Sequence, residues 1–360
     1  MPSFARSPRD SISITTRTWN CRSVATGSME MNANFGPEPS ENLINNSEKK
    51  EDEFLISYRD RFYDIRSFLK SHPGGSKALG YFKGRSLDKA FDQNPHSKSA
   101  FHLLEDFILN DREKYQEYED LIDWNAPILR QVGNLGDKYW EWMNLPVNRK
   151  IRLFESNLLE IISITPWYFI PIVWVPVCIY FLYSGFATIT NNYTGSAVFE
   201  ALVSYAFGIF LWSILEYILH RKLFHFKPPA TSKVLISLHF VIHGVHHKAP
   251  FDDRRLVFPP GAGLLVAKLL WLIYEALFSE KTIYFIAAGT TTGYICYDLI
   301  HYYLHHGSPN DGTYLYTMKR NHNYHHFSHH DLGFGISSKF WDYALGTNIY
   351  LRQLTKSIEW

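Results

Sequence analysis

Most histidines of this sequence lie in one part of the chain and fall into short, regular clusters. Fourteen of the seventeen stand between Leu219 and Asp331. Ten of them are grouped as His220 and His225; His243, His246 and His247; His301 and His305; and His322, His325 and His326. Residues at i, i+3 and i+4 share a helix face, so three clusters should each aim their imidazoles in one direction. Neutral imidazole is a common ligand of iron, zinc and copper, and ten exceed the roughly four to six positions around one ion. We therefore expect two metal ions.

Apolar stretches precede the histidine clusters. Residues 161–183 and 197–219 are each long enough to cross a bilayer core, which takes about 20 residues. The shorter stretches 261–278 and 283–299 are expected to form a hairpin that enters and leaves on the same side. Together they predict four membrane helices, with the clusters just past helix ends at the membrane rim.

The distribution of charge predicts the orientation of these helices. Lys150 and Arg152 precede the first stretch, Arg221 and Lys222 follow the second, and the loop 184–196 between them has no basic residue. The positive-inside rule then places the termini and every histidine cluster in the cytosol. The loop should be lumenal, and it carries the glycosylation sequon that begins at Asn192.

The overall composition excludes some classes of protein. A net charge of +1 gives no electrostatic bias towards nucleic acid, and three cysteines do not suggest a disulfide framework. Ten tryptophans suit a membrane interface. The first 150 residues are polar and the apolar content follows them, so we expect a polar region ahead of a membrane domain.

The polar region contains a small folded domain. Residues 1–50 are rich in Ser, Thr, Asn and Arg and predict a disordered segment. After it, two short strands should form a hairpin around Arg59 and Asp60, followed by a helix that a Pro-Gly-Gly turn ends. Helical periodicity returns over 97–116. We assign 51–116 to this domain and 117–155, which is rich in Trp, to a juxtamembrane connector.

This domain resembles cytochrome b5. His72-Pro-Gly-Gly is followed 24 residues later by His96, and the resemblance covers about residues 54–113. It implies a small α+β domain that holds haem b between His72 and His96 as axial ligands. Two axial imidazoles leave the iron no open position, so such a haem transfers electrons and does not bind oxygen.

The remaining chain, which we assign to one membrane domain over 156–360, resembles the membrane fatty acid hydroxylase superfamily, and most closely the fatty acid 2-hydroxylases. With the haem domain ahead of it, the resemblance covers essentially residues 54–350. The resemblance lies in the run from His239 through His243-Gly-Val-His-His to Asp252, in Arg255-Leu-Val-Phe-Pro-Pro, in Asp298-Leu-Ile-His-Tyr-Tyr-Leu-His and in Gly333-Phe-Gly-Ile-Ser. It implies that the ten clustered histidines hold two iron ions, which zinc can replace. Four further histidines fall outside the pattern, and we expect them to support ligands or lie on the surface: His239, His306, His329 and His330.

Several polar residues stand close to the predicted ligands. Glu216 lies four residues before His220, and Asp298 lies three before His301, so each carboxylate shares a helical face with a ligand. Such groups can orient the second nitrogen of a metal-bound imidazole. Together with Asp298, Tyr294 and Tyr297 are candidates for hydrogen bonds to the polar end of a lipid.

The expected fold is mainly α-helical: a four-helix transmembrane hydroxylase core with a cytosolic histidine-rich cap, after a small α+β haem domain. The resemblance implies O2-dependent 2-hydroxylation of fatty acyl chains for 2-hydroxy sphingolipid and ceramide synthesis. It also implies the endoplasmic reticulum membrane and an NAD(P)H-dependent reductase that supplies electrons through the haem. The alternatives are a sterol desaturase or oxidase of the same superfamily, and a non-catalytic zinc-binding membrane protein.

Overall fold

The predicted hairpin is the first element in the described part of the chain. The computed structural model describes residues 53–109, 118–189, 194–354 and 357–360, all within one unit, Asp52–Trp360. Strands β1 (Leu55–Tyr58) and β2 (Arg61–Asp64) pair antiparallel, with Leu55 opposite Asp64. Arg59 and Asp60 both have positive φ, 47° and 61°, as a two-residue type I′ turn requires. The hairpin prediction is confirmed, whereas the segment 1–50 predicted as disordered lies outside the described residues.

Short helices complete this domain. They are η1 (Arg66–Ser71), α2 (Ser76–Gly80), α3 (Asp88–Gln93), α4 (Lys98–Leu104) and η2 (Glu105–Phe107). Ser97 caps α4 by accepting a hydrogen bond from the Ala100 amide. Ile56, Tyr63 and Leu103 form the centre of its apolar core. The helical pattern was expected to reach residue 116, but η2 ends at Phe107, where Ile108 is extended. Residues 110–117 lie outside the described part.

The connector is folded. It contains η4 (Glu119–Leu121), α5 (Leu129–Val132), η5 (Gly136–Lys138) and α6 (Tyr139–Met143), and α7 (Asn157–Ile162) follows it. Trp142 is fully buried and packs with Phe240 and Val245 from the histidine-bearing region. The connector therefore supports the elements that carry the metal ligands.

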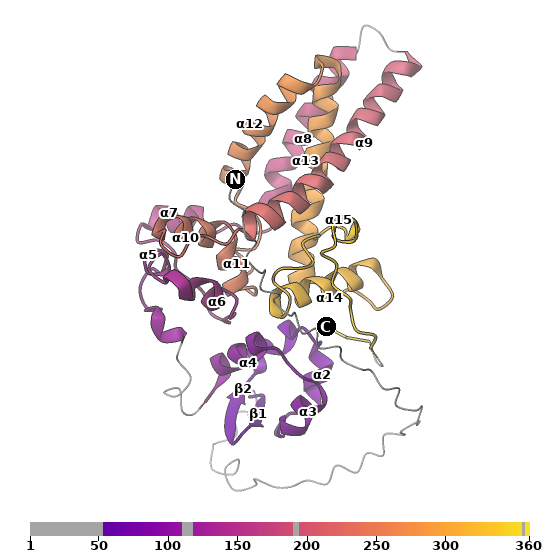
Figure 1. Ribbon diagram of the computed structural model, residues 1–360. Helices are drawn as coiled ribbons and strands as arrows, with labels where there is room; N and C mark the ends of the chain where they lie inside the picture. Colours follow the sequence, from indigo (N-terminus) through magenta and orange to yellow (C-terminus); the bar gives the residue numbers. More distant parts are fainter. Residues whose placement is uncertain (1–52, 110–117, 190–193, 355–356) are drawn as a thin grey trace, which may run out of the picture. The chain divides into compact units, whose positions relative to one another are not determined.

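Four long helices follow: α8 (Phe169–Ile189), α9 (Gly195–Ile218), α12 (Pro260–Leu277) and α13 (Glu280–His306). α8, the stretch continuing α9 to Phe224, and α12 are long and apolar enough to cross a membrane, and α13 packs against α8 and α9 (Figure 1). The first helix was expected to start near residue 161. It starts at Phe169 because Pro166 disfavours helical backbone at Thr165 and separates α7 from α8.

Glycines allow α9 and α13 to approach closely. A side chain at Gly289 would lie 2.0 Å from the Tyr205 carbonyl oxygen, and one at Gly208 would lie 2.2 Å from that of Ile286. Small residues at such crossings are typical of helix packing in membranes. This contact fixes the distance between the two helices that lead to His220 and His301.

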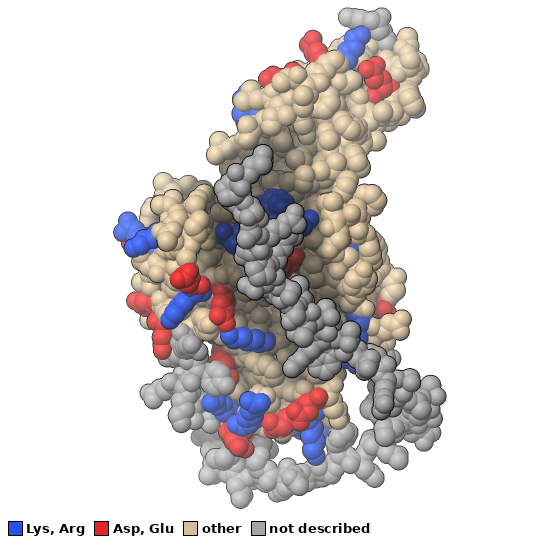
Figure 2. Space-filling view, in the orientation of Figure 1, with Lys and Arg blue, Asp and Glu red and all other residues tan. Residues whose placement is uncertain are grey.

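The surface of the long helices is apolar. Ile172, Ile179, Phe199, Leu202 and Leu265 are exposed there. Figure 2 shows a broad uncharged surface over these helices on the visible face, with charged side chains at their far tip and around the folded region at their other end. Such a surface is stable only against lipid, so the described chain is that of a membrane protein.

Candidate metal centre and haem site

Two π-helical turns position the first ligands. α9 continues into η7 (Leu219–Phe224), where the His225 amide donates to the His220 carbonyl at 3.0 Å. The second turn, η8 (Phe240–Gly244), carries His243 between α10 (Lys233–His239) and α11 (Val245–Lys248). A π turn brings residues five apart onto one face, which explains the spacing of His220 and His225. π turns inside helices are frequent at functional sites.

The other ligands come from three helices. His246 and His247 lie on α11, and His301 and His305 lie on the last turns of α13. α14 (Tyr314–Phe327) carries the last cluster, and Thr313 caps its first turn. Elements far apart in the sequence therefore deliver imidazoles to one place.

The imidazoles form two groups, in each of which the candidate ligand atoms lie within 4.8 Å of one another. One group is His246, His301, His305, His322 and His326, and the other is His220, His225, His243 and His325. His247 belongs to neither group, but its Nε2 lies 3.1 Å from Nε2 of His243. The structure thus brings all ten predicted ligands together and divides nine of them into two sites.

The spacing of the nitrogens suits metal ions. Nε2 of His301 lies 3.1 Å from Nε2 of His246, and Nε2 of His225 lies 3.0 Å from Nε2 of His325. Two nitrogens bound to one ion at about 2.0–2.1 Å are roughly 3 Å apart when the bonds are perpendicular. Both ring nitrogens of His326 are buried without a hydrogen-bond partner. A buried polar atom without a partner is costly, and a metal ion would satisfy it.

Burial also keeps these imidazoles neutral. It lowers the pKa of His225, His243 and His326 well below the usual 6.5, and neighbouring imidazoles lower it further. A neutral imidazole retains the lone pair that binds a metal. The donor set therefore fits two metal ions, and its nitrogen composition suits iron, zinc or copper.

Backbone carbonyls orient two of the ligands. Nδ1 of His220 hydrogen-bonds the Phe334 carbonyl at 2.5 Å, and Nδ1 of His325 hydrogen-bonds the Leu332 carbonyl at 2.7 Å. A proton on Nδ1 leaves Nε2 free for a metal. Both carbonyls belong to the segment 332–337, which we name the orienting loop.

Two buried carboxylates hold the orienting loop. Glu216 accepts hydrogen bonds from the amides of Ile336 and Ser337 at 2.8 and 2.7 Å. Asp342, on α15 (Phe340–Ala344), accepts from the amides of Phe334 and Gly335, both at 2.9 Å. Sequence reasoning missed Asp342, because no spacing in the sequence links it to a histidine.

The predicted carboxylate contacts to ligands are not formed. Among the described residues, neither Glu216 nor Asp298 hydrogen-bonds a ligand imidazole. Asp298 accepts from the Phe258 amide at 3.2 Å and from the Tyr294 hydroxyl at 3.0 Å. A shared helical face was not sufficient to predict a hydrogen bond between carboxylate and imidazole, because each carboxylate accepts hydrogen bonds from backbone amides instead.

The four histidines outside the pattern have different surroundings. His306 and His329 are exposed. His239 is buried, and its Nδ1 lies 2.5 Å from the Tyr139 hydroxyl. The His330 ring lies 6.0 Å from that of His247. His330 therefore borders the metal centre, whereas His329 is exposed. Of the two, His329 is the better choice for a control substitution that should leave the metal ligands undisturbed.

An apolar cavity adjoins the metal centre between α8, α9, α12 and α13. Its wall includes Tyr294 and Tyr297, two of the predicted substrate residues, and Glu216. Phe224, also in the wall, stacks on the His243 ring with centroids 5.0 Å apart.

The N-terminal domain places His72 opposite His96. Their rings are nearly parallel, at 17°, with centroids 6.4 Å apart. Nδ1 of His72 bonds the Gly75 carbonyl at 2.9 Å and that of His96 bonds the Asn94 carbonyl at 2.6 Å, which leaves both Nε2 atoms for iron. Burial lowers the pKa of His72 to about 4, so it is neutral at physiological pH. These residues fit a haem with two axial imidazoles.

Comparisons with known proteins identify both regions of the chain. The fatty acid hydroxylase family model matches residues 205–347, and that of the cytochrome b5-like heme/steroid binding domain matches residues 40–118. Fatty acid 2-hydroxylase of Homo sapiens is 41% identical over 332 residues, which cover 80% of this chain and 89% of the relative.

Two further similarities cover the hydroxylase region. A dihydroceramide fatty acyl 2-hydroxylase of Arabidopsis thaliana is 40% identical, over 63% of this chain and 92% of its own length. A solved structure described as full-length scs7p, with only the hydroxylase domain visible, is 31% identical with a TM-score of 0.59. It covers 67% of this chain and 90% of that chain. The chain therefore belongs to the fatty acid 2-hydroxylase family of membrane enzymes.

Proposed function

We propose that this enzyme uses O2 to insert a hydroxyl group at C2 of fatty acyl chains destined for 2-hydroxy sphingolipids and ceramide. The observation that carries the proposal is the pair of buried histidine groups beside an apolar cavity between membrane helices. A pair of iron ions held there would supply the oxidising power that cleavage of an unactivated C–H bond needs.

The chain's own residues bind and orient. The cavity would hold the acyl chain out of water, and its polar wall residues Tyr294 and Tyr297 would face the polar end of the lipid. The orienting loop fixes His220 and His325 through the carbonyls of Phe334 and Leu332. Ten nitrogen ligands require rigid placement, because small displacements at a reactive centre are costly in rate.

The haem domain would supply the electrons. His72 and His96 would hold haem b, and a reductase that uses NADH or NADPH would reduce it. Tethering the haem domain to the hydroxylase domain makes its encounter with the metal centre intramolecular, which raises its effective concentration.

We further propose that the enzyme lies in the endoplasmic reticulum membrane with its histidines on the cytosolic side. Tyr350 is exposed in the segment after α15, whereas Ser196 is the last residue of the predicted lumenal loop and lies at the start of α9. In sealed microsomes, a Tyr350→Cys variant should react with an impermeant thiol reagent and a Ser196→Cys variant only after permeabilisation. Asn192 of the sequon lies outside the described residues.

The test of the function is lipid mass spectrometry of cells that express the chain. They should accumulate 2-hydroxy acyl chains in sphingolipids. His246→Ala should abolish this product at equal protein level, and the exposed His329→Ala should preserve it. Altered sterols with unchanged acyl chains would favour the sterol desaturase or oxidase. No lipid change under O2 would favour a non-catalytic zinc protein.

A further inference from the structure

A chain of aromatic rings joins the haem site to the metal centre. Phe68 lies with its ring centroid 5.7 Å from that of His72. On its other side, Phe68 meets Phe251 edge to face, again with centroids 5.7 Å apart. Phe251 follows α11 by three residues, so the haem domain touches the histidine-bearing domain directly at this contact.

The chain continues to a metal ligand. The Phe251 ring lies parallel to Phe327 within 23°, with centroids 6.1 Å apart. Phe327 directly follows His326, and their ring centroids are 6.3 Å apart. His326 belongs to the group of five histidines, not to the group of four. Each separation is within the usual range of aromatic contacts.

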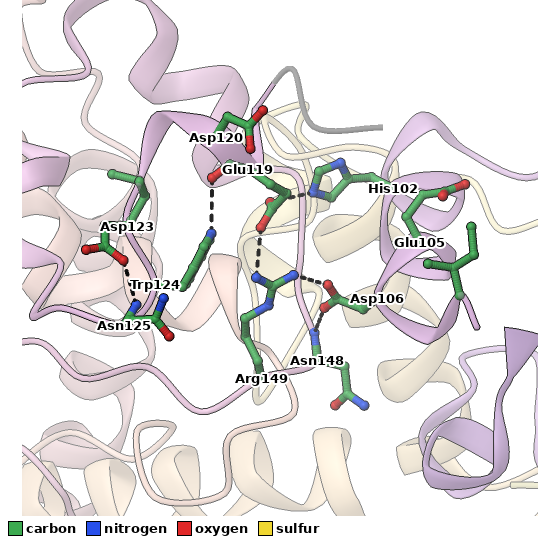
Figure 3. A pocket seen from close by; sticks show the side chains of 12 residues that line it. His102, Glu105, Asp106, Glu119, Asp120, Asp123, Trp124, Asn125, Asn148 and Arg149 are labelled. Atoms are coloured by element: carbon green, nitrogen blue, oxygen red, sulfur yellow. Dashed lines mark hydrogen bonds and ion pairs between the residues drawn. The ribbon is translucent and has the colours of Figure 1, made fainter. Parts of the chain in front are cut away.

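Charged and polar groups hold the two domains together beside this chain. Arg149 of the connector contacts both Asp106 of the haem domain and Glu119, and the Asn148 amide donates to Asp106 at 2.6 Å (Figure 3). Glu119 also lies 2.9 Å from Nε2 of His102. These contacts are partly buried, so they specify one docked arrangement more strongly than exposed pairs would.

The connection to Glu119 extends to the metal-bearing helix. The Lys248 ammonium is fully buried and donates to Glu119 at 3.2 Å and to the Leu145 carbonyl at 2.7 Å. Lys248 is the last residue of α11, next to His247 and three residues before Phe251. The polar contact therefore sets the position of the segment that carries Phe251 against the haem domain.

We infer that Phe251 is the bridge by which electrons pass from the haem to the metal centre, along Phe68, Phe251 and Phe327 to His326. The inference rests on the proposed function and deepens it. In each transfer the haem iron goes from ferrous to ferric and one iron of the metal pair goes from ferric to ferrous. The NAD(P)H-dependent reductase then reduces the haem again, and no bond forms or breaks along the bridge.

Physical reasoning favours this path. Electron transfer slows steeply with the gap between donor and acceptor, and conjugated rings in van der Waals contact shorten that gap. The path also predicts an asymmetric centre, in which electrons enter through the five-histidine group. Phe82 packs on the same apolar core as Phe68, yet it is not part of this chain of contacts, so it serves as a matched control.

The test uses the full chain loaded with haem and iron in lipid nanodiscs. The haem is reduced, the protein is mixed with O2 and an acyl substrate, and re-oxidation is followed by haem absorbance. Phe251→Leu keeps an apolar side chain but removes the ring. It should slow re-oxidation on the order of tenfold, or about 1.4 kcal/mol in barrier, with unchanged haem spectrum and iron content. Phe251→Tyr should restore the rate, and Phe82→Leu should leave it unaltered.

The outcomes separate this inference from the proposed function. An unchanged rate in Phe251→Leu, or a Phe251→Tyr protein as slow as Phe251→Leu, would overturn the bridge while parent protein still hydroxylates. If iron-loaded parent re-oxidises its haem no faster than metal-free parent and forms no 2-hydroxy product, the proposed function itself fails. Arg149→Met should also slow re-oxidation by weakening docking, without changing the haem spectrum.

Discussion

The carboxylate of Glu216, at the end of a membrane helix, accepts hydrogen bonds from both the amide and the hydroxyl of Ser337, 121 residues later. The contact ties α9 to the orienting loop. Through that loop the carbonyl of Phe334 sets the direction of the His220 ring. A buried acidic side chain in a membrane helix thus acts on the metal centre indirectly, by fixing backbone.

Removing this carboxylate should loosen the centre. Glu216→Ala leaves the amides of Ile336 and Ser337 without this acceptor, and leaving a buried donor unsatisfied costs about 1–3 kcal/mol, so we expect a loss of about 2 kcal/mol in stability. Bound metal, measured by mass spectrometry of purified protein, should fall. Glu200→Ala, at an exposed position on the same helix, should retain both the stability and the metal content of the parent protein. Full metal content in Glu216→Ala would show that the orienting loop keeps its position without the Glu216 carboxylate.

Local chemistry predicted much of this fold. The hairpin turn at Arg59 and Asp60 and the apolar stretch that became α9 follow from short-range patterns, whereas the facing of His72 and His96 was predicted from the resemblance to cytochrome b5. The start of α8 was wrong because a single proline outweighed the continuous apolar pattern. The expected four-helix core is matched in part: among the described residues, three stretches meet the length and hydropathy of a membrane helix, and the long helix α13 packs against two of them, α8 and α9.

The sequence predicted the metal ligands of the site, but not the residues that orient those ligands. Spacing identified the histidines, because ligands on one helix must share a face. The π turn that aligns His220 with His225 could not be read from α-helical periodicity. Asp342 and Phe251 were missed, since their roles depend on contacts between distant segments. Tertiary contacts of this kind leave no periodic trace in one sequence.

The two cofactor sites should be separable. His72→Ala or His96→Ala removes an axial ligand, so the low-spin haem absorption should vanish, while iron content should stay unchanged because no metal-centre ligand is altered. His102→Ala, in the same domain but bonded to Glu119, should keep the haem spectrum. Visible spectroscopy and metal analysis of the same samples provide the comparison. A normal haem spectrum in both axial variants would mean that other residues hold the haem.

The contact between domains should give the protein an acid-sensitive stability. Burial alone would raise the pKa of Glu119, but the hydrogen bond from His102 and the charges of Lys248 and Arg149 outweigh it and hold the pKa at about 2, below the usual 4.5. The unfolded state therefore binds the proton more readily. This contribution, about 3 kcal/mol, is fully present above pH 4.5 and is lost as the pH falls towards 2.

Glu119→Gln should therefore lower the free energy of unfolding at pH 7 and flatten its decline between pH 4.5 and 2. Denaturant unfolding at a series of pH values measures the free energy of unfolding and its decline. Tryptophan fluorescence is a suitable signal, because Trp124 lies beside Glu119 and donates a hydrogen bond to its backbone carbonyl at 3.2 Å. Glu155→Gln is the control, as this exposed residue pairs with exposed Arg130. Identical pH profiles for Glu119→Gln and parent would contradict the assignment.

The size of the apolar cavity should set the acyl length that the enzyme accepts. Ala267 of α12 lines the cavity and is half-buried beside α8. Ala267→Phe would fill part of this space, so 2-hydroxy products should shift towards shorter acyl chains while metal content is retained. Ala262→Phe places the same side chain at an exposed position on the same helix and should leave the product lengths as in the parent. Lipid mass spectrometry compares the two distributions, and an unchanged distribution in Ala267→Phe would place the acyl chain elsewhere.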